Sequence, residues 1–498
     1  MKKKLFLNST TSLTLQFVSI LIGLILPRMM IQYYGSTVNG LISSVAQFIS
    51  YITLFEAGMG GVVKAALYKP IADNEMFKIS TILKATDKYF KKLSIYFVIY
   101  VLLLAFIYPL VVDETFSLPY TAALIIIISV STFAQYFIGI TYSIFLQADA
   151  KNYIINVIQI FSLILNAVVT IVLITSGASI HQVKLFSAFV FVLKPIILMV
   201  YVSKQYLIVK NCKADYFSLN QRKNGLAHHI AWFLHTNTDV VVITIFGELR
   251  AVSVYSVYYM IVSSITKIAS SFVNGVEPIL GREMVEADQG SVRREFDIYC
   301  MVMNTIVIIL FFTAGAMLIP FVSLYTRKIV DADYIAPFFG YCLLAAEGVY
   351  CLRIPYHSIV TAAGHFKQTQ ASAIIETSIN IILSVLFIHV FGLAGIAFAT
   401  FAAMLYGTIY YIYYLSKNIL LISIWNNYIR NFVCIVVVFI GVWIKEMFFS
   451  LEISNYTAWI QQSFVCVVVG CFMAFAYDIC FFRNDMHYIL KMILAKKR

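Results

Sequence analysis

Charged side chains inside long apolar stretches are the first residues of this sequence that could do chemistry. Four of them are cations, namely Arg28, Lys194, Lys267 and Arg353. A charge inside an apolar segment is costly, so such residues usually face a cavity, a partner or a substrate. A guanidinium group also fits a phosphate through paired hydrogen bonds. We therefore interpret these cations as candidates for lining a cavity that binds a polar, anionic substrate.

Each candidate also has a structural explanation, which the sequence leaves open. Arg28 follows Pro27 and can either line a cavity beside a kinked helix or extend to the outer headgroups. Arg353 precedes Pro355 and can either face a ligand or form an ion pair with an acidic neighbour. The acidic neighbours in the apolar runs are Glu347 and Glu376.

Asp239 is another carboxylate within the apolar runs. It follows Asn237 and Thr238 in an otherwise apolar segment, and it can pair with a lysine or titrate as an ion-coupling site. Lys194 precedes Pro195, which predicts a broken helix at that position.

Lipid must be the solvent for the elements that position these residues. Hydrophobic residues make up 61% of the 498 residues and charged residues 12%, about half the charged share of a soluble domain. A spanning helix needs about 20 mainly apolar residues. We predict an all-α integral membrane protein with about fourteen spans, near 11–32, 38–66, 91–112, 118–147, 151–175, 182–206, 226–247, 251–280, 296–323, 336–362, 367–391, 393–416, 429–448 and 459–482.

The basic residues predict the orientation of these spans. Most of the 36 Lys and Arg residues fall on one set of alternate loops and at the two chain ends, which places both termini in the cytoplasm. The net charge of +12 then follows from membrane topology, and nucleic acid is not an expected partner. The opposite side carries few basic residues, namely Arg250, Arg327, Lys328 and Lys445, with Lys184 at its border.

Several kinds of chemistry have no signature here. The eight cysteines show no zinc or disulfide spacing, and no Gly-Lys-Ser/Thr phosphate-binding loop is present. The predicted outer loops are short, which leaves little room for the catalytic loop of a polysaccharide polymerase. We predict a protein that is not an enzyme and that needs no cofactor.

The sequence pattern predicts that the chain consists of two related halves. The predicted ranges are an N-terminal lobe at 1–206, a cytoplasmic linker at 207–225, a C-terminal lobe at 226–417, and two additional helices with a basic tail at 418–498. Spans two and eight both lose their regular pattern near the cytoplasmic side, where Glu56, Lys64 and Glu277 face the predicted cytoplasmic mouth. Duplicated halves are common in transporters, with the substrate site between them. The basic segment 67–92 is either an amphipathic helix on the inner leaflet or an ordinary connector.

Several stretches resemble the polysaccharide transporter family, whose best-known members are Wzx-type flippases of lipid-linked oligosaccharide repeat units. That family belongs to the superfamily of multidrug, oligosaccharidyl-lipid and polysaccharide exporters. The resemblance runs over most of the chain. Its stretches are Leu26-Pro27-Arg28, Tyr34-Gly35-Ser36-Thr37-Val38-Asn39-Gly40-Leu41, Phe55-Glu56-Ala57-Gly58-Met59-Gly60-Gly61, Asn237-Thr238-Asp239 and Ala363-Gly364-His365-Phe366-Lys367.

The resemblance implies two pseudo-symmetric six-helix lobes around a central cavity, with two helices added at the C-terminus. It implies alternating access in a bacterial cytoplasmic membrane, for capsule, O-antigen or similar polysaccharide synthesis. The substrate would be an oligosaccharide on an undecaprenyl-pyrophosphate carrier, and the four cations would bind its pyrophosphate or glycan. Coupled H⁺ or Na⁺ could drive transport, with Asp239 and Glu376 as coupling carboxylates. The polymerase and glycosyltransferases of the pathway would be partners, together with membrane lipid.

A second reading stays open beside the flippase. A cation-coupled extruder of drugs or small molecules, from the same superfamily, would have the same topology. Its cavity should favour aromatic and acidic residues over arginines, and a drug-sensitivity phenotype would reveal it.

Overall fold

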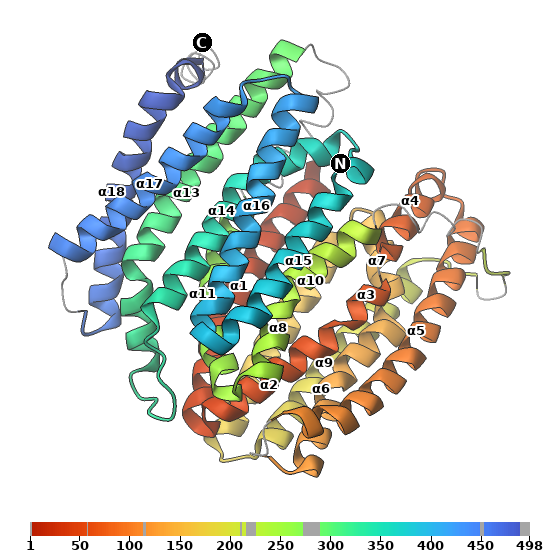
Figure 1. Ribbon diagram of the computed structural model, residues 1–498. Helices are drawn as coiled ribbons and strands as arrows, with labels where there is room; N and C mark the ends of the chain where they lie inside the picture. Colours follow the sequence, from red (N-terminus) through yellow and green to blue (C-terminus); the bar gives the residue numbers. More distant parts are fainter. Residues whose placement is uncertain are drawn as a thin grey trace. The chain divides into compact units, whose positions relative to one another are not determined.

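The computed structural model describes residues 2–56, 58–112, 116–209, 212–215, 226–271, 289–448 and 453–488. Within these ranges the chain forms α-helices and one short π-helical turn, and no β-strand (Figure 1). Twelve of the described helices are long and apolar enough to cross a membrane. The prediction of an all-α, multi-pass membrane protein is confirmed.

The chain divides into two compact units. Unit 1 consists of Met1–Phe233 and Ile243–Ser253, and unit 2 consists of Leu234–Val242 and Val254–Arg498. The finer division into lobes, linker and added helices at the predicted boundaries stays a prediction.

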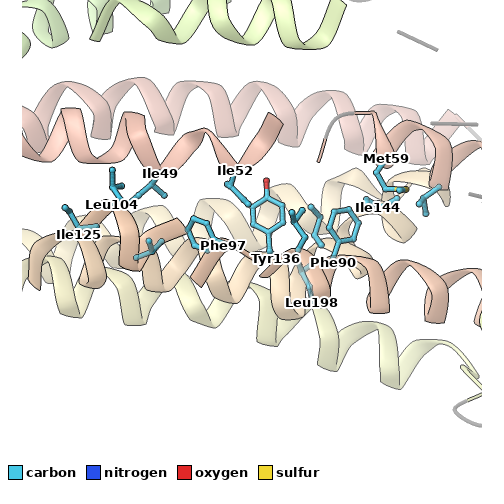
Figure 2. Close-up of a cluster of buried hydrophobic side chains, with 14 of the residues drawn as sticks. Ile49, Ile52, Met59, Phe90, Phe97, Leu104, Ile125, Tyr136, Ile144 and Leu198 are labelled. Atoms are coloured by element: carbon cyan, nitrogen blue, oxygen red, sulfur yellow. The ribbon is translucent and has the colours of Figure 1, made fainter. Parts of the chain in front are cut away.

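Unit 1 is built on a large hydrophobic core, with a smaller cluster around Met30, Ile174, Ile180 and Val183 beside it. Its helices are α1 (Lys2–Tyr34), α2 (Ser36–Ser50), α3 (Ile52–Glu56), α4 (Met59–Ala72), α5 (Met76–Val111), α6 (Leu118–Ala134), the π-helical turn η1 (Gln135–Gly139), α7 (Ile140–Ala148), α8 (Asn152–Thr175) and α9 (Ile180–Gln205). Figure 2 shows part of this core, in which Phe90 and Phe97 of α5 lie among Ile125, Tyr136 and Leu198 from α6, η1 and α9. Burial of such side chains away from lipid and water fixes the helices through close packing.

A polar cluster fastens the start of α1 to the turn between α7 and α8. Lys4 Nζ lies 3.4 Å from Asp149 Oδ1, and Lys151 Nζ lies 2.8 Å from Asp149 Oδ2. Tyr206, just after α9, donates a hydrogen bond to the same carboxylate. Asn8 Nδ2 donates to the carbonyl of Ala150 at 3.0 Å. We call Lys4, Asp149, Lys151 and Tyr206 the α1 anchor.

The second half of the chain contains eight described helices. They are α10 (Leu226–Phe246), α11 (Leu249–Ser271), α13 (Gln289–Thr326), α14 (Pro337–Ala362), α15 (Phe366–Phe391), α16 (Leu393–Asn418), α17 (Ile424–Phe448) and α18 (Tyr456–Phe481). Helix α16 packs against both α14 and α15, and α13 packs against α17 and α18 (Figure 1). Gly392, with a φ of 56°, makes the tight turn between α15 and α16 that the sequence predicts.

Buried polar contacts attach α17 and α18 to the rest of unit 2. Asn304 Nδ2 of α13 donates to Tyr477 Oη of α18 at 2.9 Å, and Tyr477 Oη donates to the carbonyl of Arg430 in α17 at 2.8 Å. Asn431 of α17 donates to Tyr356 Oη of α14 at 2.8 Å. Such bonds hold helices together where lipid offers no alternative partner.

Within the described residues, each of the fourteen predicted spans corresponds to one helix or one run of consecutive helices; residues 272–280 of the predicted span 251–280 lie outside the described residues. Two of these, α10 and α14, are not among the twelve apolar ones, and only Phe233–Phe246 of α10 counts as a shorter apolar stretch. These two helices carry several of the charged residues singled out above, including Asp239, Glu347 and Arg353. These two helices contribute His235, Asp239 and Arg353 to the candidate site described below.

Two local expectations differ from the structure. Segment 67–92 is not a separate surface helix, because α4 ends at Ala72 and α5 begins at Met76, with Ile79 and Ile82 buried in the protein core. Helix α9 is not broken at Pro195 but runs through it, as α1 runs through Pro27. Prolines are tolerated inside membrane helices because neighbouring groups satisfy the freed carbonyls.

Candidate functional site

Unit 2 contains a buried ion pair. Arg353 of α14 donates a hydrogen bond from Nη1 to Oε1 of Glu376 in α15, at 2.7 Å. Both residues are buried, with exposures of 7% and 6%. An ion pair in such surroundings is held tightly, because either charge alone would be unsatisfied. The sequence left two explanations open for Arg353, a contact with a ligand or an ion pair, and the structure shows the ion pair.

The surroundings of Arg353 are shaped to hold its guanidinium group. The rings of Tyr350 and Tyr411 lie 5.1 and 5.8 Å from the guanidinium carbon, which are cation–π distances. Gly407 of α16 gives the pair its space, because a Cβ there would sit 2.3 Å from Arg353 Nη1 and 2.3 Å from Glu376 Oε2. A side chain at position 407 would therefore push directly against the ion pair.

His235 of α10 approaches the pair from another helix. Its Nε2 lies 3.9 Å from Glu376 Oε1, which is beyond hydrogen-bond distance. Both ring nitrogens are buried and have no hydrogen-bond partner within the described part of the chain. A small movement of either side chain would bring the imidazole into contact with the carboxylate.

Asp239 lies one turn after His235 on α10, and its partners among the described residues are neutral. Its Oδ2 accepts hydrogen bonds from Tyr255 Oη at 2.9 Å and from Thr400 Oγ1 at 3.0 Å. Asn380 Nδ2 donates to the same threonine hydroxyl at 3.1 Å. The Oδ1 atoms of Asp239 and Asn380 are buried and accept no hydrogen bond from the residues that the structure describes.

We name the residues of this site the unit 2 cluster, which consists of His235, Asp239, Tyr255, Arg353, Glu376, Asn380 and Thr400. Their contacts determine which ligands the cluster can bind. Glu376 is neutralised by Arg353, whereas no ion pair of Asp239 is found among the described residues. A carboxylate with spare oxygens beside an amide and a hydroxyl can take up a proton or a small cation. Within the unit 2 cluster, Asp239 is therefore the carboxylate that no described cation neutralises.

The other predicted cations are distributed between the two units. Arg28 in α1 and Lys194 in α9 are half-buried residues of unit 1, and Lys267 in α11 is an exposed residue of unit 2. Glu347 accepts a hydrogen bond from Thr266 at 2.9 Å. Glu277 lies outside the described residues. The structure thus brings Arg353 and Glu376 together, and the binding roles of Arg28, Lys194, Lys267 and Arg353 stay a prediction.

Several members of the unit 2 cluster were not predicted from the sequence. Tyr255, Asn380 and Thr400 are uncharged and did not stand out in the sequence. The spacing of polar residues was the signal that could have pointed to this cluster. His235 and Asp239 are four residues apart and share one helix face, and so do Glu376 and Asn380. Each pair therefore gives its helix a polar face, although the sequence does not show that the two faces meet.

Comparison with known proteins supports the fold. No protein-family model matches the chain, and no significant match was found among curated proteins. Among solved structures, the lipid II flippase MurJ in an inward closed conformation matches 95% of this chain and 99% of its own, with a TM-score of 0.68 and 15% identity.

Transporters of the multidrug MATE family are also similar. An inward-facing MATE transporter of the MOP superfamily matches 84% of this chain and 95% of its own, at 15% identity and a TM-score of 0.57. The MATE multidrug transporter DinF-BH, solved as a complex, matches 84% and 96%, at 16% identity and a TM-score of 0.58. The chain therefore has the fold of the transporters and flippases of this superfamily.

Proposed function

We propose that the chain is a flippase for undecaprenyl-pyrophosphate-linked oligosaccharide repeat units. It would move them from the cytoplasmic to the outer leaflet of a bacterial cytoplasmic membrane, for capsule, O-antigen or a similar polysaccharide. The observation that carries this proposal is the fold match to a lipid II flippase over 95% of the chain. The two MATE transporters described above each match a smaller share of the chain, 84%.

The physical task of such a protein is to shield a polar headgroup. A glycan with many hydroxyls and a pyrophosphate cannot cross a bare bilayer, because every polar group would lose its hydrogen bonds to water. A polar cavity replaces those bonds while the lipid tail stays in the bilayer, and alternating access exposes it to each side in turn. No covalent bond changes, so the protein acts as a transporter rather than an enzyme.

We assign different tasks to the predicted cations. Arg28, Lys194 and Lys267 are cations within the apolar helices α1, α9 and α11, and they are the candidates for binding the pyrophosphate. Arg353 is already bound to Glu376, so it can contact an anion only when that pair opens. Both termini lie in the cytoplasm in this proposal, where the glycosyltransferases act; the polymerase would receive the flipped product outside.

We further propose that Asp239 couples transport to an ion, either H⁺ or Na⁺. The supporting observations are its two neutral donors and the unpartnered Oδ1 atoms of Asp239 and Asn380 among the described residues. Binding of an ion there would draw α10, α15 and α16 together, since these helices supply the oxygens. Glu376, the other carboxylate predicted for coupling, would take part through the release of Arg353.

A cation-coupled extruder of small molecules is the second candidate. The matches to two MATE transporters favour it, and a coupling carboxylate would serve it equally well. The two functions differ in cargo, so cargo is what an experiment must resolve.

Proteoliposomes provide the test. The purified chain is reconstituted with a fluorescent undecaprenyl-pyrophosphate oligosaccharide, and the exposure of the label to an external quencher is followed with and without a pH or Na⁺ gradient. We expect wild-type protein to translocate the lipid and one of the two gradients to accelerate it. Export of a cationic dye without any movement of lipid-linked glycan would instead identify an extruder.

Variants separate the function from the ion site. Asp239→Asn keeps acceptors for Tyr255 and Thr400, so we expect it to fold and to lose the response to the gradient. Asp478→Asn is the matched control, because Asp478 is also a buried carboxylate of unit 2 that accepts a hydrogen bond from Thr305, at 2.8 Å. An undiminished gradient response in Asp239→Asn would refute the coupling assignment while leaving the flippase proposal intact.

A further inference from the structure

Unit 1 contains a cavity that the proposed ion site does not involve. It has a volume of about 480 Å³, within the usual range for a small-molecule site. It lies where the second span is interrupted, between α3 and α4, and α7 and η1 complete its wall. Its polar lining consists of Glu56, Lys64, Gln135, Tyr136, Ser143 and Gln147.

The interruption of the helix places the start of α4 at this cavity. Helix α3 ends at Glu56 and α4 begins at Met59, and Gly58 between them has a φ of 75°. Gly58 occupies the cap position of α4 and supplies no side-chain acceptor. The first N–H groups of a helix have no partner within the helix. Gly60 and Gly61, in this first turn, line the cavity and keep its floor open.

The π-helical turn η1 positions the opposite wall. It presents Gln135 and Tyr136 to the cavity, and Tyr136 Oη donates a hydrogen bond to Glu56 Oε2 at 2.9 Å. At its end, Gly139 allows close contact with α9, because a Cβ at that position would lie 2.6 Å from Pro195 Cβ. A π-turn inside a helix changes the register of side chains and is frequent at functional sites.

The lining groups favour a neutral ligand with many hydroxyls. Glu56 and Lys64 carry opposite charges, so the two together give the lining no net charge that would select an anion or a cation. The amides of Gln135 and Gln147 both donate and accept hydrogen bonds, as a sugar hydroxyl does. Ser143 is 7% exposed, and its Oγ has no hydrogen-bond partner among the described residues, so it is available to a ligand in the cavity.

We propose that this cavity is a saccharide subsite, which binds a sugar residue of the lipid-linked oligosaccharide while the pyrophosphate is bound elsewhere. The inference rests on the proposed flippase function and names the part of the substrate that unit 1 recognises. In the predicted orientation the cavity opens toward the cytoplasm, the side on which the glycan would be loaded.

Binding measured with and without sugar tests this subsite. The full chain in detergent is titrated, with native mass spectrometry as readout, against lipid-linked oligosaccharide extracted from its native host and against bare undecaprenyl pyrophosphate. We expect wild-type protein to bind the glycosylated carrier about tenfold more tightly, as expected from one or two net hydrogen bonds. Gly61→Leu should reduce this preference to about one, because its side chain would fill the cavity.

Gly23→Leu is the matched control for this variant. A Cβ at Gly23 in α1, like a Cβ at Gly61, meets no atom within 4 Å, and neither position has a positive φ. Both variants should therefore fold, and Gly23→Leu should keep the preference. Glu56→Gln preserves the shape of the cavity and should lower the preference by a smaller factor.

The outcomes separate this inference from the function on which it rests. Equal binding of both carriers by wild-type protein, or full preference in Gly61→Leu, would overturn the subsite; lipid movement in proteoliposomes would then keep the flippase proposal. Failure to bind either carrier, together with no lipid movement, would remove both.

Discussion

Units 1 and 2 both place polar and charged residues inside the membrane protein, but they treat them differently. In the cavity of unit 1, Ser143 Oγ has no hydrogen-bond partner within the described part of the chain, and Gly58, Gly60 and Gly61 line the space. In unit 2, Arg353 and Glu376 satisfy each other in a space that Gly407 makes just large enough. Unpaired polar groups around a cavity suit ligand binding, whereas paired groups without free space hold helices together and can act as a switch.

Removal of one charge from the closed pair should have the largest effect on stability. Arg353→Ala leaves Glu376 buried without its cation, and we expect a loss of about 3–5 kcal/mol of folding free energy. The measurement is thermal unfolding of the detergent-solubilised protein. Arg353→Met with Glu376→Gln removes both charges and should lose less than Arg353→Ala alone. An unchanged melting temperature in Arg353→Ala would show that unit 2 does not depend on the pair.

A single added methyl group tests the difference in free space. Gly407→Ala would force Arg353 and Glu376 apart, and we expect it to cost about 1–3 kcal/mol, as overpacking does. Gly61→Ala meets no atom within 4 Å and should be neutral or stabilising by up to about 1 kcal/mol, since alanine favours a helix. The same thermal assay compares the two. Equal losses would contradict the distinction between an open and a closed site.

The α1 anchor extends the comparison to an ion pair between Asp149 and Lys151, which lie between the apolar helical segments Leu118–Ala148 and Asn152–Thr175. Burial alone would raise the pKa of Asp149, but hydrogen bonds from Lys151 and Tyr206 and the charges of Lys151 and Lys4 lower it overall. The pKa of Lys151 is raised, because its bonds to Asp149 and Tyr206 outweigh the effect of burial. Asp149→Asn should cost about 1–2 kcal/mol, less than Arg353→Ala, because the pair is partly solvated.

The pH dependence of this anchor follows from the two shifts. A lowered carboxylate pKa contributes stability above the ordinary value of about 3.9, and that contribution is lost as the pH falls through the folded-state pKa. A raised lysine pKa contributes below about 10.4 and is lost as the pH rises through the folded-state pKa. The difference in melting temperature between wild type and Asp149→Asn should therefore be constant from about pH 5 to pH 9. A difference that changes within this range would exclude the ion pair as its cause.

Most of the fold was predictable because apolar segments of spanning length are a strong signal. Each predicted span corresponds to helical structure within the described residues, and the interruption between α3 and α4 lies in the second span, which was predicted to lose its regular pattern near the cytoplasmic side. The π-turn η1 was not predicted, because it lies where Gly139 packs closely on Pro195, a residue distant in the sequence. Segment 67–92 was ambiguous, since the same alternation of lysines and apolar residues fits a helix on lipid and a helix on protein.

The candidate site was predictable only in part, because charge marks the residues but not their partners. Arg353 had two acidic neighbours in the sequence, and only the packing of α14 against α16, and of α16 against α15, selects Glu376. Asp239 accepts hydrogen bonds from Tyr255 and Thr400, which lie 16 and 161 residues away from it in the sequence. Hydroxyl groups are common in membrane helices, so nothing in their local sequence distinguishes these two.

The bond between α13 and α18 also sets an order of events during synthesis. Asn304 and Tyr477 are 173 residues apart, and a ribosome adding about 5–20 residues per second needs roughly 10–35 s to cover that distance. For this interval α13 is in the bilayer with an amide whose partner has not yet been made. The insertion machinery or a transient neighbour must shelter this helix, and a chain that stalls before α18 would present a polar face to lipid and to quality-control proteases.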